Sequence, residues 1–240
     1  MRHEMPRAVS VICQALREQI GRGLLRPGSR LPAERRLSEL FATTRITLRE
    51  ALAQLEAQGL IYREERRGWF ISPPPLVYDL MSRGEFDARV RAQGREAQTR
   101  LISARLQPAP ADMCERLQLP ALSSVIQICR ANSIDGQSVL YVEHYLKPAF
   151  FPDILESDLT CSLGGLYADR YRLEGEAHVE IRPVALRGEA CAALKASAGS
   201  PALCISRITF DRHGHPVACD MEYWRHHAIR VCAVIAPDAR

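Results

Sequence analysis

The first third of the chain has a helical pattern of apolar positions. Apolar side chains such as Val9, Ile12 and Leu16 recur at every third or fourth position, and this spacing predicts amphipathic helices. A connection rich in glycine and proline follows the first of these stretches, and Thr43 and Thr44 are suited to starting the third helix. The three helices are expected over residues 7–21, 33–41 and 44–59.

A hairpin and a proline-rich stretch come next. Short apolar runs at 60–63 and 68–71 flank the polar segment EERR, and together they predict a two-stranded hairpin. The SPPP segment at 72–75 can neither continue a strand nor begin a helix internally, so we expect a stiff linker there. Three helices followed by a two-stranded wing are typical of a winged helix-turn-helix.

Beyond the linker, most apolar stretches alternate with polar residues or are continuously apolar. Two pairs of stretches flank turn signals, Asp135-Gly136 and the RHGH segment at 212–215. We expect strands at 100–106, 123–134, 138–146, 178–186, 202–211, 216–225 and 231–236, and helices at 162–173 and 188–197. Several hairpins with a few helices predict an α+β domain built on a mainly antiparallel sheet.

The composition is that of a globular protein. The 240 residues (26.9 kDa) allow one or two domains, and 47% hydrophobic and 25% charged residues exclude wholesale disorder. No stretch approaches the ~20 apolar residues of a membrane helix, and the N-terminus lacks the apolar core of a secretion signal. We therefore expect a cytoplasmic protein with no membrane partner. Eight cysteines form no CxxC pair, which favours reduced, mostly buried thiols over disulfides or a metal site.

Positive charge is concentrated at the N-terminus. Residues 1–75 contain 13 arginines and 8 acidic residues, a net charge of +5, whereas residues 76–240 carry −1. Arginine presents a planar fork of donors that fits phosphates and guanine edges. This asymmetry indicates a nucleic-acid-binding module joined to a domain of another kind. A GC-rich genome would explain arginine in place of lysine, but it would not explain the asymmetry.

Polar residues on the outer face of the third helix are the leading candidates for nucleic-acid contact. Arg45 and Arg49 are four residues apart and therefore share a face, and Thr44 and Thr47 add hydroxyl groups. The alternative for these residues is a solvated basic face, and the helix-turn-helix-wing order favours DNA binding. The expected hairpin tip adds Arg66, Arg67 and Gly68.

The run LRPGSRLPAERRLSELFATTRITLREALAQLEAQGLIYREERRGWFIS resembles the winged helix of GntR-type transcriptional regulators over nearly all of residues 7–72. Two departures are visible. Ala33 stands at the usual serine position, which weakens the cap of the second helix, and Thr43-Thr44 replaces Val-Ser but keeps a hydroxyl. The resemblance implies DNA contact by Arg35, Thr44, Arg45, Thr47, Arg49 and Gly68.

Residues 77–240 are similar to the UTRA effector-binding domain of the HutC branch of that family, which has a chorismate-lyase-like fold. The segment from Gly94 to Thr99, Arg130 before the Asp135-Gly136 hairpin, Ser162 and DRHGHPVACDMEYWRH carry this resemblance. It implies a small anionic effector. The stretches TTRITLRE, RRGWF, QGRE and EYWRH resemble regulators of 2-aminoethylphosphonate utilisation, which makes that phosphonate the expected effector. A sugar phosphate, an amino-acid breakdown product such as urocanate, or a fatty acid is the alternative.

The two ends of 2-aminoethylphosphonate need different partners. Its phosphonate requires an arginine fork and hydroxyls, and its ammonium requires a carboxylate and an aromatic face. The family often has a second arginine two residues after Arg130, and Asn132 at that position indicates either a weaker phosphate site or a different anion. Ion pairing, solvent exposure or helix capping are the structural alternatives for these side chains. The candidate effector-binding residues are Thr99, Arg130, Asn132, Glu143, Ser162, Tyr167, Glu222 and Arg225.

Other chemistries find little support in the sequence. His213 and His215 lie in a turn where no spacing completes a metal site, and the GxSxG and P-loop motifs are absent. We expect no metal, no cofactor and no catalytic residue, with a small lyase-like enzyme as the remote alternative. The expected organisation is a winged helix-turn-helix over 1–72, a linker over 73–76, and an effector-binding and dimerisation domain over 77–240.

Overall fold

The computed structural model describes residues 7–81, 85–172 and 176–234. The described residues form two compact units, of which the first comprises residues 7–77 together with 195–197 and 226–230. The second unit comprises the other described residues. Each unit is α+β in character, and each is described by itself below.

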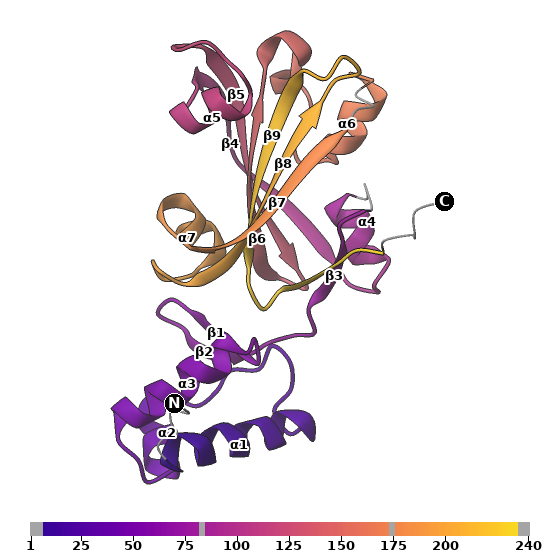
Figure 1. The fold of residues 1–240 in the computed structure, drawn as a ribbon. Helices are drawn as coiled ribbons and strands as arrows, with labels where there is room; N and C mark the ends of the chain where they lie inside the picture. The colour runs from indigo at the N-terminus through magenta and orange to yellow at the C-terminus, as the bar shows by residue number, and fades with distance from the viewer. Residues whose placement is uncertain (1–6, 82–84, 173–175, 235–240) are drawn as a thin grey trace, which may run out of the picture. The chain divides into compact units, whose positions relative to one another are not determined.

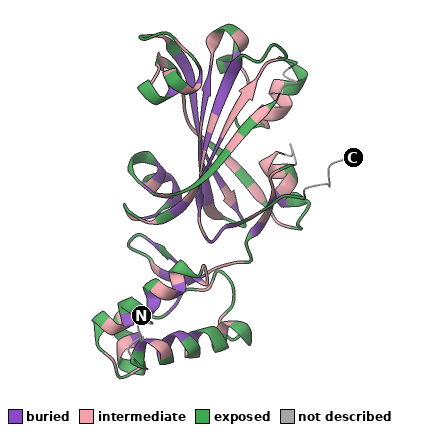
Figure 2. Ribbon diagram, in the orientation of Figure 1, coloured by how far each residue is buried: buried purple, intermediate pink, exposed green. Residues whose placement is uncertain are grey.

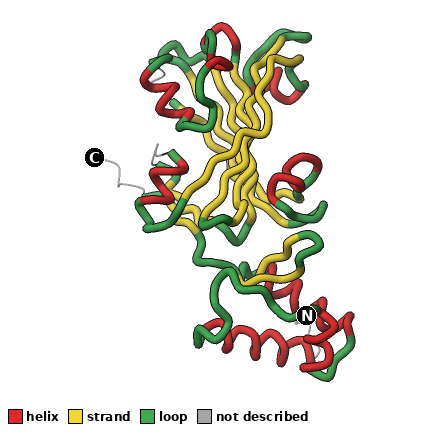
Figure 3. The backbone as a smooth tube through the Cα atoms, turned by 180° about the vertical axis from the view of Figure 1, so that it is seen from behind, coloured by secondary structure: helices red, strands yellow, loops and turns green. Residues whose placement is uncertain are grey.

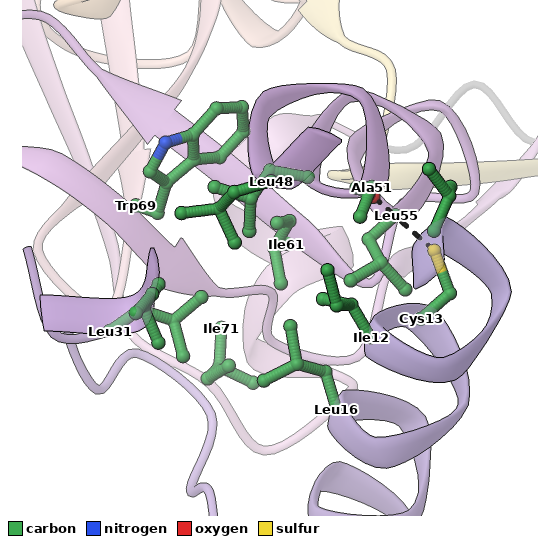
Figure 4. Close-up of a cluster of buried hydrophobic side chains, with 13 residues drawn as sticks. Ile12, Cys13, Leu16, Leu31, Leu48, Ala51, Leu55, Ile61, Trp69 and Ile71 are labelled. Atoms are coloured by element: carbon green, nitrogen blue, oxygen red, sulfur yellow. Dashed lines mark hydrogen bonds between the residues drawn. The ribbon is translucent and has the colours of Figure 1, made fainter. Parts of the chain in front are cut away.

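The first unit is a three-helix bundle with a two-stranded hairpin (Figure 1). Its elements are α1 (Arg7–Gly21), α2 (Glu34–Leu40), α3 (Arg45–Ala57), β1 (Ile61–Glu64) and β2 (Gly68–Ile71). The apolar stripes of α1 and α3 meet in one buried core, in which Ile12 and Leu16 lie near Leu55 and Ile61 (Figure 4). The helical spacing of apolar residues therefore predicted this core correctly.

The start and end of α3 are fixed by local chemistry. Thr44 caps the helix by accepting a hydrogen bond from the Thr47 backbone N–H at 3.2 Å. Gly59 ends it with φ +72°, and the Leu60 N–H donates to the Leu55 carbonyl, as in a Schellman motif. The Thr44 cap fixes where α3 begins, so it also sets which residues form the first turn of the helix.

The second unit is built on a six-stranded sheet in which all neighbouring strands are antiparallel. The strand order is β4-β5-β6-β9-β8-β7, and Figure 3 shows these long strands from behind. The strands are β4 (Ala97–Pro108), β5 (Ser124–Ile134), β6 (Gln137–Leu146), β7 (Ala177–Ala185), β8 (Pro201–Phe210) and β9 (Pro216–Arg225). The described residues also include a two-stranded sheet of β3 (Leu76–Asp79) and β10 (Ile229–Cys232). The central strands are buried, and the outer surfaces of the helices are exposed (Figure 2).

Helices cover both faces of the six-stranded sheet (Figure 1). On one side, Leu163 of α6 (Leu163–Asp169) packs with Ile128, and Phe86 of α4 (Phe86–Arg91) contacts Trp224. We call this side the α4/α6 face. On the other side, α5 (Ala111–Arg116) packs in a second core that includes Met113, Tyr145 and Met221, and α7 (Gly188–Leu194) meets β6, where Glu189 accepts a hydrogen bond from Tyr141. We call this side the α5/α7 face.

Strand register assigns each side chain to one of these faces. Residues that lie directly opposite each other in an antiparallel pair project to the same side. Arg130 lies opposite Val142, and Val142 lies opposite Glu222, so all three belong to the α4/α6 face. Cys129 lies opposite Glu143 and therefore belongs with Glu143 on the α5/α7 face.

Several elements differ from the sequence-based expectation. The short elements β3, α4 and α5 were not expected, nor were the 3-10 turns Pro148–Phe150 and Ile154–Glu156. Because β3 begins at Leu76, residue 76 is part of a strand and not of the linker. α7 ends at Leu194 because Lys195 has a left-handed φ of 52°. α6 ends at Asp169 and β10 spans 229–232, while residues 173, 235 and 236 of the expected elements lie outside the described part of the chain.

Candidate nucleic-acid interface and small-molecule site

The N-terminal turn of α3 presents an exposed set of mixed chemistry. Arg45 is exposed and forms no ion pair among the described residues, so its guanidinium is free to meet an external partner. Ile46 beside it is 82% exposed, an unusual position for a large apolar side chain. The hydroxyls of Thr44 and Thr47 lie 2.9 Å apart on the same turn. Charge, hydroxyl and methyl groups together are what major-groove readout uses.

Arg49 is held in place by a carboxylate of α2. Its Nε donates to Glu34 Oε2 at 2.8 Å, and the Trp69 indole N–H of β2 donates to Glu34 Oε1 at 3.1 Å. Burial alone would raise the pKa of Glu34, but the hydrogen bonds from Arg49 and Trp69 outweigh burial and hold that pKa below its usual value. One carboxylate thus joins α2, α3 and the hairpin.

The hairpin tip is basic and has special backbone geometry. Arg66 has φ +60°, and Gly68 has φ +99°. Arg67 pairs with Glu64 and lies over the Phe70 ring at 5.2 Å. The Arg30 guanidinium lies against Gly68, about where a side chain at 68 would reach, and sequence reasoning missed it. Arg30 reaches this position because it forms an isolated bridge with Phe70 of β2, a contact that no local sequence pattern contains.

Arg35 on α2 completes the predicted set. Its side chain is 80% exposed and lies 4.0 Å from Glu39, at the limit of an ion pair. A pair this long and this exposed contributes little. Arg35 therefore remains available to an external partner.

Arg130 is the centre of a buried polar cluster on the α4/α6 face. It is 7% exposed, and its Nη1 donates to the Cys161 carbonyl at 2.8 Å. Its Nε donates to His144 Nε2 at 3.2 Å, while His144 Nδ1 lies 2.7 Å from Asp220 Oδ1. Because a guanidinium can only donate, Nε2 is the bare acceptor and Nδ1–H donates to Asp220. Burial lowers the pKa of His144, against the pull of Asp220, which agrees with a neutral imidazole.

Two buried polar atoms on this face have no hydrogen-bond partner among the residues that the structure describes. Asn132 donates from Nδ2 to Thr99 Oγ1 at 3.2 Å, but its Oδ1 is buried and without a hydrogen bond. The Tyr167 hydroxyl of α6 is also buried and unpartnered. Buried polar atoms are rarely left unpaired in folded proteins. These orphan atoms indicate a site that a polar ligand completes.

Ser162 and Glu85 lie at the start of α6. Ser162 caps the helix by accepting from the Gly165 N–H at 2.9 Å. Burial raises the pKa of Glu85, whereas the positive charge of Arg130 and the Ser162 hydroxyl act to lower it. Glu85 was not among the predicted residues, since nothing in its sequence surroundings marks it.

Glu222 is on the same face but is already well satisfied. The Tyr78 hydroxyl donates to Oε1 at 3.3 Å, and the Trp224 indole donates to Oε2 at 2.7 Å. Burial raises the pKa of Glu222, although these two donors and Arg207 act in the opposite direction. A cationic ligand group at this carboxylate would share it with two aromatic residues.

Glu143 and Arg225 do not join the cluster. Glu143 lies on the α5/α7 face between the hydroxyls of Tyr141 and Tyr145, at 3.2 and 3.3 Å. Arg225 is buried there and donates to the Leu194 carbonyl at the end of α7, so it works as a helix C-cap. The expectation that all eight residues meet in one site is therefore corrected: Thr99, Arg130, Asn132, Ser162, Tyr167 and Glu222 share a face, and these two do not.

The remaining chemistry gives no further site. All eight cysteines are free thiols, four of them buried, while Cys161 and Cys232 are exposed. Within residues 7–81, 85–172 and 176–234, no three His, Cys, Asp or Glu side chains gather as they would around a metal ion. No helix in the described part of the chain is both long and apolar enough to cross a membrane.

Comparison with protein families assigns both halves of the sequence. The profile described as "Bacterial regulatory proteins, gntR family" matches residues 8–71, and the profile described as "UTRA domain" matches residues 92–230. The second match alone covers more than half of the chain.

Individual proteins agree with these matches. The chain is 32% identical over 209 residues to the uncharacterized HTH-type transcriptional regulator YihL of Escherichia coli K12, covering 86% of this chain and 89% of YihL. It is 27% identical over 213 residues to an E. coli K12 protein named "Probable fructoselysine utilization operon transcriptional repressor", covering 87% and 86%. The crystal structure of PhnF from Mycobacterium smegmatis matches with a TM-score of 0.64 at 23% identity, over 94% of this chain and 99% of that one. At that identity the likeness shows the fold.

Proposed function

This chain belongs to the GntR family of bacterial transcriptional regulators and carries a UTRA domain, and we propose that it binds operator DNA under the control of a small anionic effector. We assign DNA binding to residues 1–72 and effector binding to residues 77–240, with the prolines at 73–75 as the connection before β3. The observation that carries the first assignment is the unpaired, exposed Arg45 beside Ile46 at the start of α3. Thr44, Thr47, Arg49, Arg35 and the hairpin tip at Arg66, Arg67 and Gly68 complete the proposed DNA-binding set.

The proposed effector site is the cluster around Arg130. A buried arginine with donors on both sides and orphan acceptors nearby supports an anionic ligand that also carries hydrogen-bonding groups. The proposed contacts are Arg130, Thr99, Asn132 and Ser162 for the anion, with Tyr167 beside them. Glu222 is the proposed partner of a cationic group.

We propose 2-aminoethylphosphonate as the effector to test first, and phosphonate-utilisation genes as the target. Its phosphonate matches Arg130 and Ser162, and its ammonium matches Glu222. The segments TTRITLRE, RRGWF, QGRE and EYWRH support this narrower assignment by their resemblance to regulators of 2-aminoethylphosphonate utilisation.

A sugar-derived anion is the second candidate. The relative named for fructoselysine utilization favours it, because its name ties a similar chain to a sugar conjugate. Asn132 also favours it, since an amide carbonyl accepts from sugar hydroxyls whereas an arginine at this position would bind a second phosphate oxygen.

The proposed mechanism is a shift between two arrangements of the protein. The effector can change DNA affinity only if it binds one arrangement more tightly than the other. We propose that the protein acts in the cytoplasm as a homodimer, represses in the free state, and releases its operator when the effector binds.

A thermal-shift screen tests the effector assignment. A ligand that binds only the folded protein raises its melting temperature by mass action. We expect a selective rise with 2-aminoethylphosphonate over other phosphonates, sugar phosphates and urocanate, and loss of that rise in Arg130→Ala. A selective rise with a sugar phosphate would keep the regulator and replace the phosphonate. No response to any anion would contradict the anionic effector.

A further inference from the structure

Glu85 places its carboxylate at the start of a helix that is not its own. It is the N-cap residue of α4, yet its side chain makes no capping hydrogen bond there. The carboxylate instead lies against Gly164 at the start of α6, where the Ser162 hydroxyl and the Gly164 backbone act to lower its pKa. A Cβ atom built on Gly164 would lie 1.8 Å from Glu85 Oε1, so the carboxylate can sit there only because residue 164 is glycine.

The position that Glu85 fills has the partners that an effector anion requires. Arg130 provides the attractive charge, and Ser162 and the Gly164 N–H provide donors. Arg130 itself is 7% exposed, so this is a buried positive charge and not a surface one. The Tyr167 hydroxyl has no hydrogen-bond partner among the described residues, and the charges of Arg130 and Glu85 act on its pKa in opposite directions.

The surroundings of Glu85 act on its charge in opposite directions. Burial raises its pKa although Arg130 and the two donors act in the opposite direction, and the nearby Asp220 raises it further. A second anion at the same donors would face the Glu85 carboxylate at short range, and like charges at such a distance exclude each other. An anionic ligand and the seated Glu85 therefore cannot share the position.

We propose that Glu85 is an internal anion that occupies the effector's acidic position in the free protein, and that the effector binds by displacing it. The inference rests on the proposed function, because it concerns the same Arg130 cluster. It adds that the ligand must compete with a built-in carboxylate, so that weakly charged ligands are rejected.

Displacement of Glu85 would act directly on α4. Phe86, the next residue, packs on Trp224 with ring centroids 6.0 Å apart. One turn later, Arg89 donates to the Asp79 carbonyl at 2.8 Å and lies 4.0 Å from the Tyr78 ring. α4 therefore connects the anion position to β3, the strand that directly follows the proline-rich linker. This connection is the route by which we expect a bound anion to reach the linker.

A double-mutant cycle tests where Glu85 sits without any ligand. Gly164→Ala adds a Cβ that meets the Glu85 carboxylate, so it should lower the melting temperature of the otherwise unchanged chain. In a Glu85→Ala background the obstacle is gone, and alanine is the better helix former, so the same change should be neutral or stabilising. Equal effects of Gly164→Ala in both backgrounds would overturn the proposal.

Anion affinity tests the competition itself. Inorganic phosphate and 2-aminoethylphosphonate are titrated calorimetrically against the full-length chain, Glu85→Ala and Glu115→Ala. If the Glu85 carboxylate fills the position most of the time, Glu85→Ala should tighten anion binding about tenfold or more. The apparent affinity is proportional to the fraction of protein in which the position is open to the ligand. Glu115→Ala removes one charge from exposed α5 on the opposite face and should change nothing.

The two tests separate the possible failures. Unchanged or weaker anion binding by Glu85→Ala would overturn displacement while leaving the anionic effector intact. If neither the unchanged chain nor Glu85→Ala binds any anion, the proposed effector class fails and the displacement fails with it. In that case, unequal effects of Gly164→Ala with and without Glu85→Ala would still support the position of Glu85. The error would then lie in the assigned ligand.

Discussion

The two outward-facing arginines of α3 differ in how they are held. Arg45 is exposed and forms no ion pair within the described part of the chain, whereas Arg49, one turn later on α3, is anchored to Glu34. Two arginines four residues apart therefore differ in freedom. Arg45 is the one we propose to read bases, and Arg49 also stabilises the fold, because Glu34 connects it to Trp69 of β2.

Arg45→Ala should weaken operator binding by about 1–3 kcal/mol and relax base preference, because a bidentate arginine contact is lost. Fluorescence anisotropy with operator and random duplexes, at one fixed salt concentration, would measure this. The control Arg22→Ala removes the same charge just after α1. It should weaken operator binding less than Arg45→Ala does and leave the base preference unchanged. Unchanged operator binding by Arg45→Ala would remove α3 from the proposed base-reading role.

Glu34→Gln should lower the stability of the first unit by about 1 kcal/mol at neutral pH, since a charge-assisted hydrogen bond becomes a neutral one on a partly exposed pair. The pKa of Glu34 is lowered in the folded state, so its ionised form contributes above its usual pKa, and this contribution is lost as pH falls through the folded pKa. The melting temperatures of the two proteins should therefore converge below about pH 4. Glu39→Gln, on an exposed pair, serves as the control.

Among the elements, α2 begins without a side-chain cap. Ala33 occupies the N-cap position with φ −55° and ψ 146°, extended backbone that a capping serine readily adopts. Ala33→Ser should raise the free energy of unfolding by about 1 kcal/mol and the melting temperature by a few degrees, because the serine hydroxyl can cap α2. The matched change Ala57→Ser, at the exposed end of α3, supplies the same hydroxyl without a cap. Equal melting temperatures for Ala33→Ser and the unchanged chain would show that α2 is capped by other means.

One irregularity in the β5–β6 hairpin explains the position of Glu143. Next to the turn, Ile134 pairs with Gln137 and Ser133 with Ser138, and continuing this register would place Glu143 opposite Ile128, on the face of Arg130. The register shifts by one residue between Asn132 and Ser133, and a shift of one moves every later side chain of a strand to the other face. The bulge has no clear sequence signal, so Glu143 could not be assigned to a face beforehand.

Length is one reason why some elements could be predicted and others not. α1, α3 and the six long strands repeat their pattern often enough to be recognised, whereas α4 and α5 have six residues each and β3 has four. β1 and β2 are equally short, but they could be recognised because they flank the polar segment EERR. Arg225 is a different case. It lies three residues after Glu222 on β9, so alternation alone would have placed the two on opposite faces.

For the molecule as a whole, the sequence indicated which polar residues belong to the candidate effector site better than it indicated which residues surround them. Arg130, Asn132 and Ser162 were chosen as polar residues in a resembling pattern, and they share one face in the structure. His144, Asp220 and Glu85 were missed, because their importance arises from contacts between β5, β6, β9, α4 and α6 that no local pattern contains.

A single winged helix reads few base pairs, so we expect a two-fold dimer on a palindromic operator. Light scattering coupled to size exclusion should give a mass near twice 26.9 kDa. Footprinting should show two half-sites about 10 base pairs apart, centre to centre, or a multiple of that. A mass of one chain at concentrations that bind operator would contradict this arrangement.

The division of the sheet into two chemically separate faces also bears on how such sensors diversify. On β5, β6 and β9, neighbouring residues point alternately to the α4/α6 face and to the α5/α7 face. In the proposed effector site, a substitution at Asn132 should therefore leave the packing around Met113 and Tyr145 unchanged. Under this proposal, effector preference can change through a few substitutions on the α4/α6 face, while the α5/α7 face preserves the scaffold.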